Sequence, residues 1–448
     1  MARVLALDVG TTNVRASVFA DTGRPEPGEA KRRHEGSDDP EELAEAVEEV
    51  VEEARREAGE IDAVGASCFW HSLLALDRRG RPLTSVLLWS DLRSTEDAER
   101  LAARLDPDAV HGRTGCVLHP SYWPAKLAWL RKADPELFGR AARFVSFSEY
   151  VYGRLVGEAP TSLSMASGTG LLDLARRDWD EELLRELGLD PGQLPSISDE
   201  PVGEAEPWYP ALGDGACSNL GVGAVSLERA ALTVGTSGAF RTAYAAAEAR
   251  PRKGLFLYRL DGERWVEGGS LSDGGNLLHW LSRTLQLPEG DELAARDPDA
   301  HGLTFLPFLG GERSPGWNAR ARGAIAGLSF DTEPLDLLHA ALEGMAFRFA
   351  EVAELMPEVE EVVATGGALV RNVDRMQILA DILELPVVTS EVEEGSARGA
   401  AVAVLERLGE TPEPAPLGRV FEPRSDRGDA YREARERQRS LYSDLNGE

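Results

Sequence analysis

One local pattern occurs twice in this chain, about half its length apart, and it restricts the possible folds more than any other feature. The stretch LALDVGTTNVRASVF begins at Leu5, and ALTVGTSGAFRTAY begins at Ala231. Each is predicted to form an apolar strand, a Gly-Thr turn and a second strand. Two such copies predict two similar domains that face each other across a cleft. The alternative is a chance likeness between two common turns.

Length, hydrophobicity and cysteine spacing limit the broad class of the protein. A chain of 448 residues is too long for one ordinary core, which predicts two or three domains. No run approaches the roughly 18 apolar residues of a membrane-spanning helix, and the first residues lack the apolar core of a signal peptide. We therefore expect a cytoplasmic protein without a membrane partner. Cys68, Cys116 and Cys217 are widely spaced, which favours reduced structural thiols.

The net charge of -29 argues against a nucleic-acid partner, since phosphate neutralisation needs clustered Lys and Arg. If the ligands are anionic, the overall field of the protein opposes their approach. Local donors, helix termini or a metal ion must then reverse that field at the site.

The first copy of the repeated pattern places an aspartate at the end of a buried strand. An ionised Asp8 is costly there unless a hydrogen-bond network or a cation compensates it. The turn after it offers backbone N–H groups and hydroxyls at close range, and the second copy offers the same, which suits the phosphates of one nucleotide. Beside phosphates, Asp8 has a natural task in holding hydrated Mg²⁺. The alternative is an aspartate that only caps the turn.

Two further stretches carry candidate chemistry. Asp214 lies between two glycines in LGDGACSNLGVGAV, where backbone and ligand can approach closely. The stretch VVATGGALVRNVDRMQILADIL is predicted to be a strand, a glycine pair and a helix, with room for a flat ring or a phosphate at the turn. Neither a Gly-x-x-x-x-Gly-Lys-Ser/Thr loop nor a dinucleotide fingerprint is present.

In this order, the stretches LALDVGTTNVRASVF, LLWSDLRS, LGDGACSNLGVGAV, LTVGTSGAF, LPFLGGERSPGWNARARGAIAGLS and TGGALVRNVDRMQILADIL resemble the FGGY family of carbohydrate kinases. The resemblance covers nearly the whole chain. It implies an α/β fold of two actin-like (ribonuclease H-like) domains that face each other across a nucleotide and sugar cleft. The expected domains are residues 1–224, with the sugar site and the first phosphate turn, and residues 225–448, with the second phosphate turn and the adenine pocket.

The resemblance also implies roles for individual residues, with ATP and Mg²⁺ as the cofactors. It makes Asp214 the catalytic base and Asp8 the residue that orders Mg²⁺. It places three groups on ATP: Gly10, Thr11, Thr12 and Asn13 in the first turn; Gly235, Thr236 and Ser237 in the second; and Gly366, Gly367, Ala368 and Asn372 around the adenine and ribose.

The segments that choose the sugar look most like the gluconate kinases within the family. The residues expected to bind substrate are Trp70, His71, Asp91, Arg93, His119 and Lys126. Their cationic members could oppose the charge of a sugar acid. The alternatives are buried polar groups for the histidines and surface ion pairs for Arg93 and Lys126. Where these kinases usually carry a Met-His pair, this chain has Trp70-His71, whose larger indole would alter the sugar cavity.

The reaction that the resemblance implies is transfer of the ATP γ-phosphoryl group to a terminal hydroxyl of an open-chain sugar acid, with gluconate as the expected substrate. A pentulose kinase acting on xylulose or ribulose is the alternative within the class. A more distant alternative is an actin-fold ATPase switch without a sugar site. We expect a hinge near residues 220–230 for domain closure. The charged C-terminal segment YREARERQRSLYSDL is predicted to be a helix, which is either a solvated face or a homodimer interface.

Overall fold

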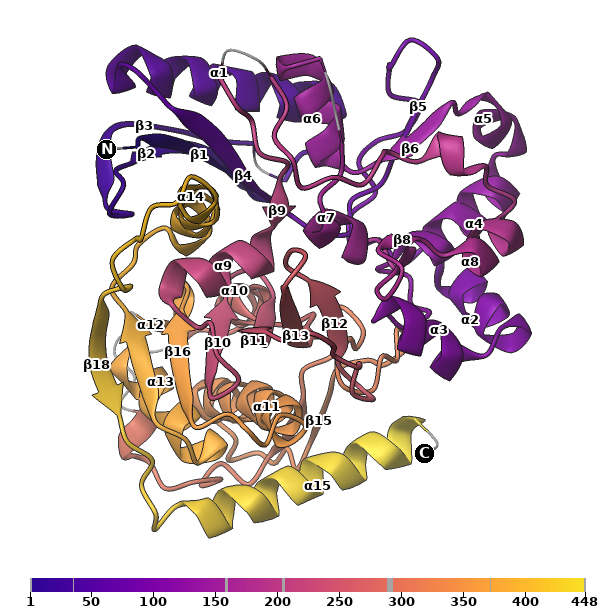
Figure 1. Cartoon of the computed structure of the whole chain (residues 1–448). Coiled ribbons are helices and arrows are strands. Elements are labelled where there is room, and N and C mark those ends of the chain that lie inside the picture. The colour runs from indigo at the N-terminus through magenta and orange to yellow at the C-terminus, as the bar shows by residue number, and fades with distance from the viewer. Residues whose placement is uncertain are drawn as a thin grey trace.

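The computed structural model describes residues 2–34, 36–157, 160–203, 206–287, 293–370 and 372–446, apart from the side chains of residues 368 and 369. The described part consists of two α/β halves, each built on a β-sheet (Figure 1). None of the described helices combines the length and the apolar character that a membrane crossing needs. The mixed α/β class predicted from the sequence is confirmed.

The first half is built on a five-stranded sheet in the order β3-β2-β1-β4-β9. Neighbours among β1, β2 and β3 are antiparallel, whereas β1, β4 and β9 are parallel. Because parallel strands end at one edge of a sheet, the residues that follow β1 and β9 are brought to the same edge. The strand bounds are β1 (Val4–Val9), β2 (Asn13–Phe19), β3 (Pro25–Arg33), β4 (Ala63–Cys68) and β9 (Leu212–Gly213).

The second half is built on a seven-stranded sheet in the order β12-β13-β11-β10-β16-β17-β18. Its centre repeats the arrangement of the first sheet, since β10 pairs antiparallel with β11 and parallel with β16. The strand bounds are β10 (Arg229–Val234), β11 (Gly238–Ala245), β12 (Phe256–Arg259), β13 (Arg264–Leu271), β16 (Glu361–Thr365), β17 (Val387–Ser390) and β18 (Leu417–Phe421).

Helices and three short strand pairs surround these sheets. The helices of the first half are α1 (Pro40–Ala58), α2 (Thr95–Arg104), α3 (Pro107–Thr114), α4 (Trp123–Ala133), α5 (Pro135–Arg140), α6 (Phe147–Leu155), α7 (Leu163–Ser167), α8 (Glu181–Leu187) and α9 (Asp214–Val222). Those of the second half are α10 (Gly275–Thr284), α11 (Pro334–Glu354), α12 (Gly367–Val370), α13 (Val373–Leu383), α14 (Gly395–Arg407) and α15 (Gly428–Asn446). The strand pairs are β5 (Leu74–Leu76) with β6 (Arg143–Val145), β7 (Leu172–Asp173) with β8 (Asp178–Trp179), and β14 (Thr304–Leu306) with β15 (Ala324–Ala326); 3-10 turns span Pro191–Gln193 and Leu293–Ala295.

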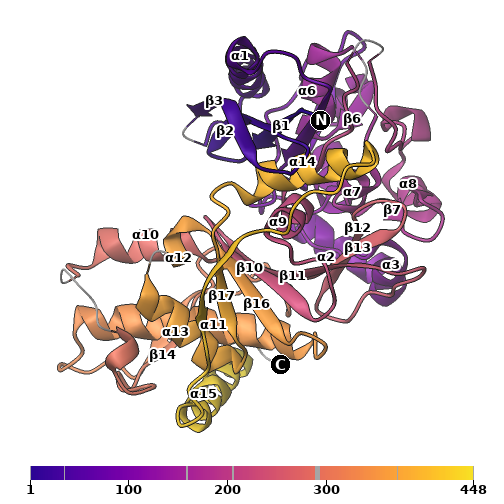
Figure 2. The same ribbon diagram turned by 60° about the vertical axis from the view of Figure 1, so that its left-hand side comes forward.

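Helices from both halves cover the first sheet. Helix α1 begins after Asp39, whose carboxylate accepts the N–H of Glu41 at 2.9 Å, and its apolar stripe is buried as predicted. Helix α14 packs Ala400 and Val404 against Ala6 of β1, although it belongs to the second half (Figure 2). The two halves therefore share part of their packing beside the cleft.

The two copies of the repeated pattern are confirmed as two hairpins. In the first, Val9 pairs with Val14 next to the turn, and Asp8 pairs with Arg15 one rung further back. In the second, Val234 pairs with Gly238 next to the turn, and Thr233 lies opposite Ala239 on the next rung. Both turns reach the space between the sheets, where two neighbouring cavities lie.

Candidate active site

Two carboxylates lie at the bottom of the space between the halves. Asp8 lies near the end of β1, and Asp214 is the first residue of α9, directly after β9. Both line a cavity of about 260 Å³, which we call the smaller cavity. The pKa of Asp8 is raised to about 6, mainly by burial and in part by the charge of Asp214. Burial also raises the pKa of Asp214, whereas the nearby charge of Arg241 lowers it.

The turn residues of both hairpins border the smaller cavity together with aromatic and basic side chains. Gly10 and Thr11 come from the first turn, and residues 235–237 form the second turn. The remaining wall is formed mainly by Trp70, His71, Trp89, Arg241, Phe256, Tyr258, Ser270 and Arg313. A cavity with acids at one end and aromatic and basic groups around it suits a small polyhydroxylated ligand.

His71 is held in one orientation on the wall of the smaller cavity. Its Nδ1 lies 2.6 Å from the carbonyl oxygen of Gly168 and therefore donates, which leaves Nε2 to accept from Arg313 Nη2 at 3.3 Å. Burial and the charge of Arg313 lower the pKa of His71 well below its usual range. The backbone of His71 has a φ of 69°, a strained conformation that is common at functional sites.

Trp70 is the largest side chain on this wall, and three glycines make room for it. A Cβ atom at Gly168, Gly213 or Gly215 would overlap the indole ring. The indole N–H donates to the carbonyl oxygen of Ser164 at 3.0 Å, and the ring meets Tyr258 edge-on with 5.0 Å between centroids. Trp70 is therefore a fixed wall of the cavity, as its unusual place in the sequence suggested.

A larger cavity of about 710 Å³ adjoins the smaller one and shares Asp8, Gly10, Thr11 and Gly235 with it. Its other predicted residues are Thr12, Asn13, Gly366 and Gly367, while unpredicted ones include Arg15, Lys31 and residues 390–396. The size and the two Gly-Thr turns at its inner end suit a nucleotide with its phosphates toward the smaller cavity.

A glycine is required at one point in the larger cavity. Gly366 has a φ of 102°, and a Cβ there would overlap the carbonyl oxygen of Val234 in the second hairpin. Asn372, predicted to touch the ribose, instead caps α13 by accepting the N–H of Arg375 at 3.0 Å, and it does not line the cavity. The side chain of Ala368 lies outside the described residues.

Four residues predicted to bind substrate do not line the smaller cavity. Arg93 forms an ion pair with Asp91 at 2.5 Å and lies over the ring of Trp129. The structure therefore shows the ion pair that was the alternative to substrate binding for Arg93. The ammonium of Lys126 donates to the carbonyl oxygen of His71 at 2.6 Å, and burial lowers its pKa to about 7. Lys126 thus supports the backbone behind His71.

His119, the fourth of these residues, lies behind the aromatic wall. Its Nδ1 is 3.1 Å from Ser121 Oγ, and its ring meets Trp317 edge-on. Burial, together with the charge of Arg313, lowers the pKa of His119 to about 3, so the ring is neutral. Of the six predicted residues, the structure places Trp70 and His71 on the cavity.

Two arginines that the sequence analysis did not single out reach the smaller cavity. Arg241 extends from β11, and Arg313 extends from the loop after Phe308 and lies over the ring of Trp89. That loop is anchored by Glu312, which pairs with Arg348 of α11 and accepts the hydroxyl of Tyr442 from α15. Two features of the sequence could have identified these arginines. Arg241 is the one charged residue in the strand GAFRTAYA, and Arg313 lies in the stretch GERSPGW.

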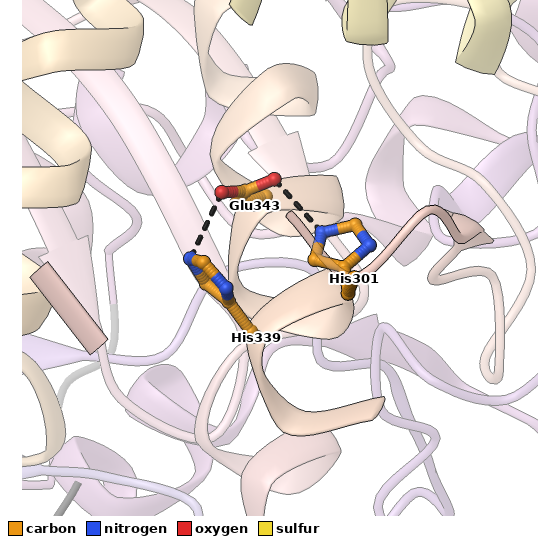
Figure 3. Close-up of side chains that lie close together, drawn as sticks. All are labelled: His301, His339 and Glu343. Atoms are coloured by element: carbon orange, nitrogen blue, oxygen red, sulfur yellow. Dashed lines mark hydrogen bonds and ion pairs between the residues drawn. The ribbon is translucent and has the colours of Figure 1, made fainter. Parts of the chain in front are cut away.

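A separate group of titratable residues in the second half, His301, His339 and Glu343, lines neither cavity. Figure 3 shows how their side chains point toward one another. His301 Nδ1 accepts the N–H of Leu303 at 2.9 Å, so its Nε2 is the protonated nitrogen and donates to Glu343 at 3.0 Å. A metal ligand would need the opposite tautomer. Burial opposes ionisation of Glu343, but the two histidines outweigh it and lower its pKa to about 2. The group is thus a buried hydrogen-bonded cluster.

Family models match most of the chain. The model of the N-terminal domain of the FGGY family of carbohydrate kinases matches residues 3–208, and that of the C-terminal domain matches residues 230–405. The chain belongs to this family. The FGGY kinases use ATP as phosphoryl donor, and the protein is a carbohydrate kinase. The recognition made from the sequence motifs is confirmed.

Individual FGGY kinases resemble the chain over nearly its full length. A gluconokinase of Bacillus subtilis (strain 168) is 31% identical over 91% of this chain and 88% of its own, and a xylulose kinase of the same organism is 28% identical over 90% and 87%. The crystal structure of a gluconate kinase from Lactobacillus acidophilus matches with a TM-score of 0.89 and 26% identity, covering 99% of this chain and 98% of that one. The predicted fold of two actin-like, ribonuclease H-like domains is confirmed.

Proposed function

We propose that this FGGY kinase transfers the γ-phosphoryl group of ATP to a terminal hydroxyl of an open-chain sugar acid, with gluconate as the expected substrate. The observation that carries the proposal is a pair of buried guanidinium groups, Arg241 and Arg313, on the smaller cavity. Neither lies within ion-pair distance of a carboxylate in the part of the chain that the structure describes. A buried cation without an acidic partner is costly, and an anionic substrate would compensate it.

The contrast with the rest of the molecule strengthens this argument. The chain carries 77 acidic and 48 basic residues, and many of its described arginines form ion pairs with acids. Gluconate carries a carboxylate that can accept bidentate hydrogen bonds from a guanidinium, whereas a pentulose offers only hydroxyl and keto groups. The structure thus supports a sugar acid at the smaller cavity.

Asp214 is positioned to act as general base in this reaction. It is the first residue of α9, where the helix dipole favours a negative charge, and its Oδ1 accepts the N–H of Gly215 at 2.9 Å. It lies on the cavity that would hold the sugar, beside the turns that would hold the phosphates. We propose that Asp214 accepts the hydroxyl proton as the oxygen attacks in line.

Charge neutralisation would come from both turns and from a cation. The N–H groups and hydroxyls of residues 10–12 and 235–237 border the place where the transferred group would pass. The paired carboxylates of Asp8 and Asp214 at the foot of an anion-binding cavity suit Mg²⁺, which prefers carboxylate, water and phosphate oxygens. Asp8 would hold Mg²⁺, which supplies positive charge beside the phosphates when bound.

The same proposal divides the chain into domains of residues 1–224 and 225–448, with a hinge at residues 220–230. Helix α9 ends at Val222, Gly223 follows with a φ of 74°, and β10 begins at Arg229. Each of the two large sheets lies wholly on one side of this boundary. Closure about this connection would exclude water from the phosphoryl group.

The first experiment is an ADP-release assay with Mg-ATP against gluconate, other sugar acids, xylulose, ribulose and glycerol. We expect a selective response to gluconate, and we expect Asp214→Asn to lower kcat by about 10²–10⁴-fold while ATP binding persists. Turnover of the variant within a few fold of the parent would remove Asp214 from the mechanism. ADP release that is independent of any sugar would instead favour an ATPase switch.

A pentulose kinase is the second candidate. It is favoured by the likeness of this chain to the xylulose kinase of Bacillus subtilis. The crystal structure of a xylulose kinase from Lactobacillus acidophilus also matches, with a TM-score of 0.89 and 26% identity over 99% of this chain and 98% of that one. A selective response to xylulose or ribulose in the same assay would transfer the assignment to this candidate. The proposed phosphoryl-transfer chemistry would remain unchanged.

A further inference from the structure

Strand β11 carries a single charged residue, Arg241, in the sequence GAFRTAYA. The residue is 8% exposed and lines the smaller cavity. An arginine in the interior strand of a sheet is unfavourable for folding unless something compensates its charge. Arg241 therefore needs an explanation beyond the stability of the sheet.

Neutral groups hold the guanidinium in place. Its Nε donates to Asn219 Oδ1 at 3.2 Å, and its Nη2 donates to Thr233 Oγ1 at 3.1 Å. Asn219 is itself fixed, because its amide nitrogen donates to the carbonyl oxygens of Ala224 and Arg241. These contacts fix the direction of the guanidinium, and the nearby carboxylate of Asp214 compensates part of its charge without forming an ion pair with it.

Two glycines keep space around this side chain. A Cβ at Gly215 would lie 2.7 Å from Arg241 Nη1, and a Cβ at Gly268 would lie 2.9 Å from its Cγ. Nη1 therefore reaches the start of α9, beside Asp214 and Trp70. No hydrogen bond joins Nη1 to a residue that the structure describes, so its donors remain available to a ligand.

The other two arginines of the cleft have different surroundings. Arg313 donates Nη2 to His71 and lies over Trp89, and its Nε is closed off from solvent without a partner among the described residues. Arg15, at the larger cavity, pairs with Glu394. Of the two arginines on the smaller cavity, Arg241 is thus the one whose guanidinium is oriented by two hydrogen bonds to neutral side chains while Nη1 is bonded to no described residue.

We propose that Arg241 determines substrate specificity by binding the carboxylate of the sugar acid, so that the enzyme selects the acid over a neutral sugar of the same length. This inference rests on the proposed function, and it goes further by assigning the choice of substrate class to one side chain. A hydrogen-bonded, desolvated charge pair gives strong discrimination, because the neutral analogue leaves the buried cation unpaired.

The test compares gluconate with D-glucitol, which has a hydroxymethyl group in place of the carboxylate. In the wild-type enzyme, kcat/KM for gluconate should exceed that for glucitol by at least about 100-fold. In Arg241→Met, the value for gluconate should fall at least about 100-fold more than that for glucitol, because only the acid loses a charged partner. Loss of the Arg241 charge also raises the pKa of Asp214, which affects both substrates alike. Arg241→Lys keeps the charge without the planar fork, so its preference for gluconate over glucitol should lie between those of the wild-type enzyme and Arg241→Met.

Arg259→Met is the matched control for loss of a buried arginine. Arg259 lies on β12, donates Nε to the carbonyl oxygen of Leu174 at 2.9 Å, stacks on Trp265 and does not line the smaller cavity. This variant should lower the melting temperature but preserve the preference for gluconate over glucitol. Melting curves of both methionine variants separate a folding defect from a change in specificity.

Each other outcome has a definite meaning. If both substrates lose activity equally in Arg241→Met, Arg241 is structural or acts on the shared chemistry, and the inference is overturned. If the variant keeps the gluconate preference, Arg313 suffices to recognise the carboxylate, and the inference is again overturned while the proposed function stands. If the wild-type enzyme prefers neutral sugars, both the inference and the choice of a sugar acid fail.

Discussion

The two hairpins share one backbone plan but differ at one rung of their ladders. One residue pair back from the turn, the first hairpin has Asp8 opposite Arg15, and the second has Thr233 opposite Ala239. Both turns begin with Gly-Thr and both border the cavities. The shared plan therefore supplies a Gly-Thr turn at the cavities twice, while an acid and a base occur on this rung in the first copy alone.

The second hairpin carries its arginine two residues further from the turn. Because side chains alternate along a strand, Arg241 faces the same side as Ala239 but lies one repeat deeper. Arg15 accordingly lines the larger cavity, and Arg241 lines the smaller one. The difference teaches that one scaffold can direct a cation to either of two adjoining cavities by a shift of two residues.

The largest expected effect is on turnover, and it should differ between Asp8 of the first hairpin and Thr233, which occupies the same rung of the second. Asp8→Asn should lower kcat by at least about 100-fold, the usual scale for loss of a group that stabilises charge in the transition state. Thr233→Val removes a neutral hydrogen bond to Arg241 and should cost about tenfold or less in kcat/KM. Steady-state kinetics with Mg-ATP and gluconate measure both, and equal losses would break the distinction between the hairpins.

The same substitution should have the opposite effect on stability. Burial raises the pKa of Asp8 to about 6, so the folded state disfavours the ionised carboxylate. This cost is absent below the ordinary carboxyl pKa of 3.8, grows as the pH rises toward 6 and is complete above it. Asp8→Asn should therefore stabilise the protein by up to about 3 kcal/mol at pH 8 and by less than about 1 kcal/mol at pH 4.

Thermal melting of both proteins across this pH range measures the difference, with Thr233→Val as the control that titrates no group. A gain in melting temperature that is the same at pH 4 and pH 8 would contradict the assigned cause. A loss at pH 8 would show that the Asp8 carboxylate stabilises the fold, and the view of a strained functional acid would fail.

Local patterns explain what could be predicted from the sequence. The two Gly-Thr turns, Asp8 and Asp214 lie at the ends of short apolar strands, and such signals depend on neighbours in the sequence. The helix that begins at Pro40 was predictable for the same reason, since its cap and its apolar stripe are contained within it.

The charged wall of the smaller cavity depends on tertiary packing and could not be predicted in this way. Arg93 has a suitable charge, yet its partner is Asp91, two residues away. Lys126 is turned toward backbone carbonyls. Arg241 and Arg313 become neighbours of Asp214 only when the second sheet packs beside the first. Residue type alone cannot distinguish these outcomes.

The smallest expected effect concerns the arginine of the first hairpin. Arg15 pairs with Glu394, which precedes α14, and both residues line the larger cavity. If the phosphates of ATP compete with Glu394 for this guanidinium, Glu394→Gln should lower KM for ATP by up to about fivefold, the scale of a partly exposed ion pair. The KM for gluconate should not change, because neither Arg15 nor Glu394 lines the smaller cavity.

Glu413→Gln is the matched control, since Glu413 also joins the two halves through an ion pair, with Arg24, but neither residue lines the larger cavity. It should leave KM for ATP unchanged, and the effect of Glu394→Gln should shrink in high salt. A higher KM for ATP in Glu394→Gln would mean that the pair closes the cleft around the nucleotide. Glu394 would then assist nucleotide binding. The contrast between Arg15, which forms an ion pair, and Arg241, which forms none with a described residue, would then no longer distinguish two kinds of anion-binding site.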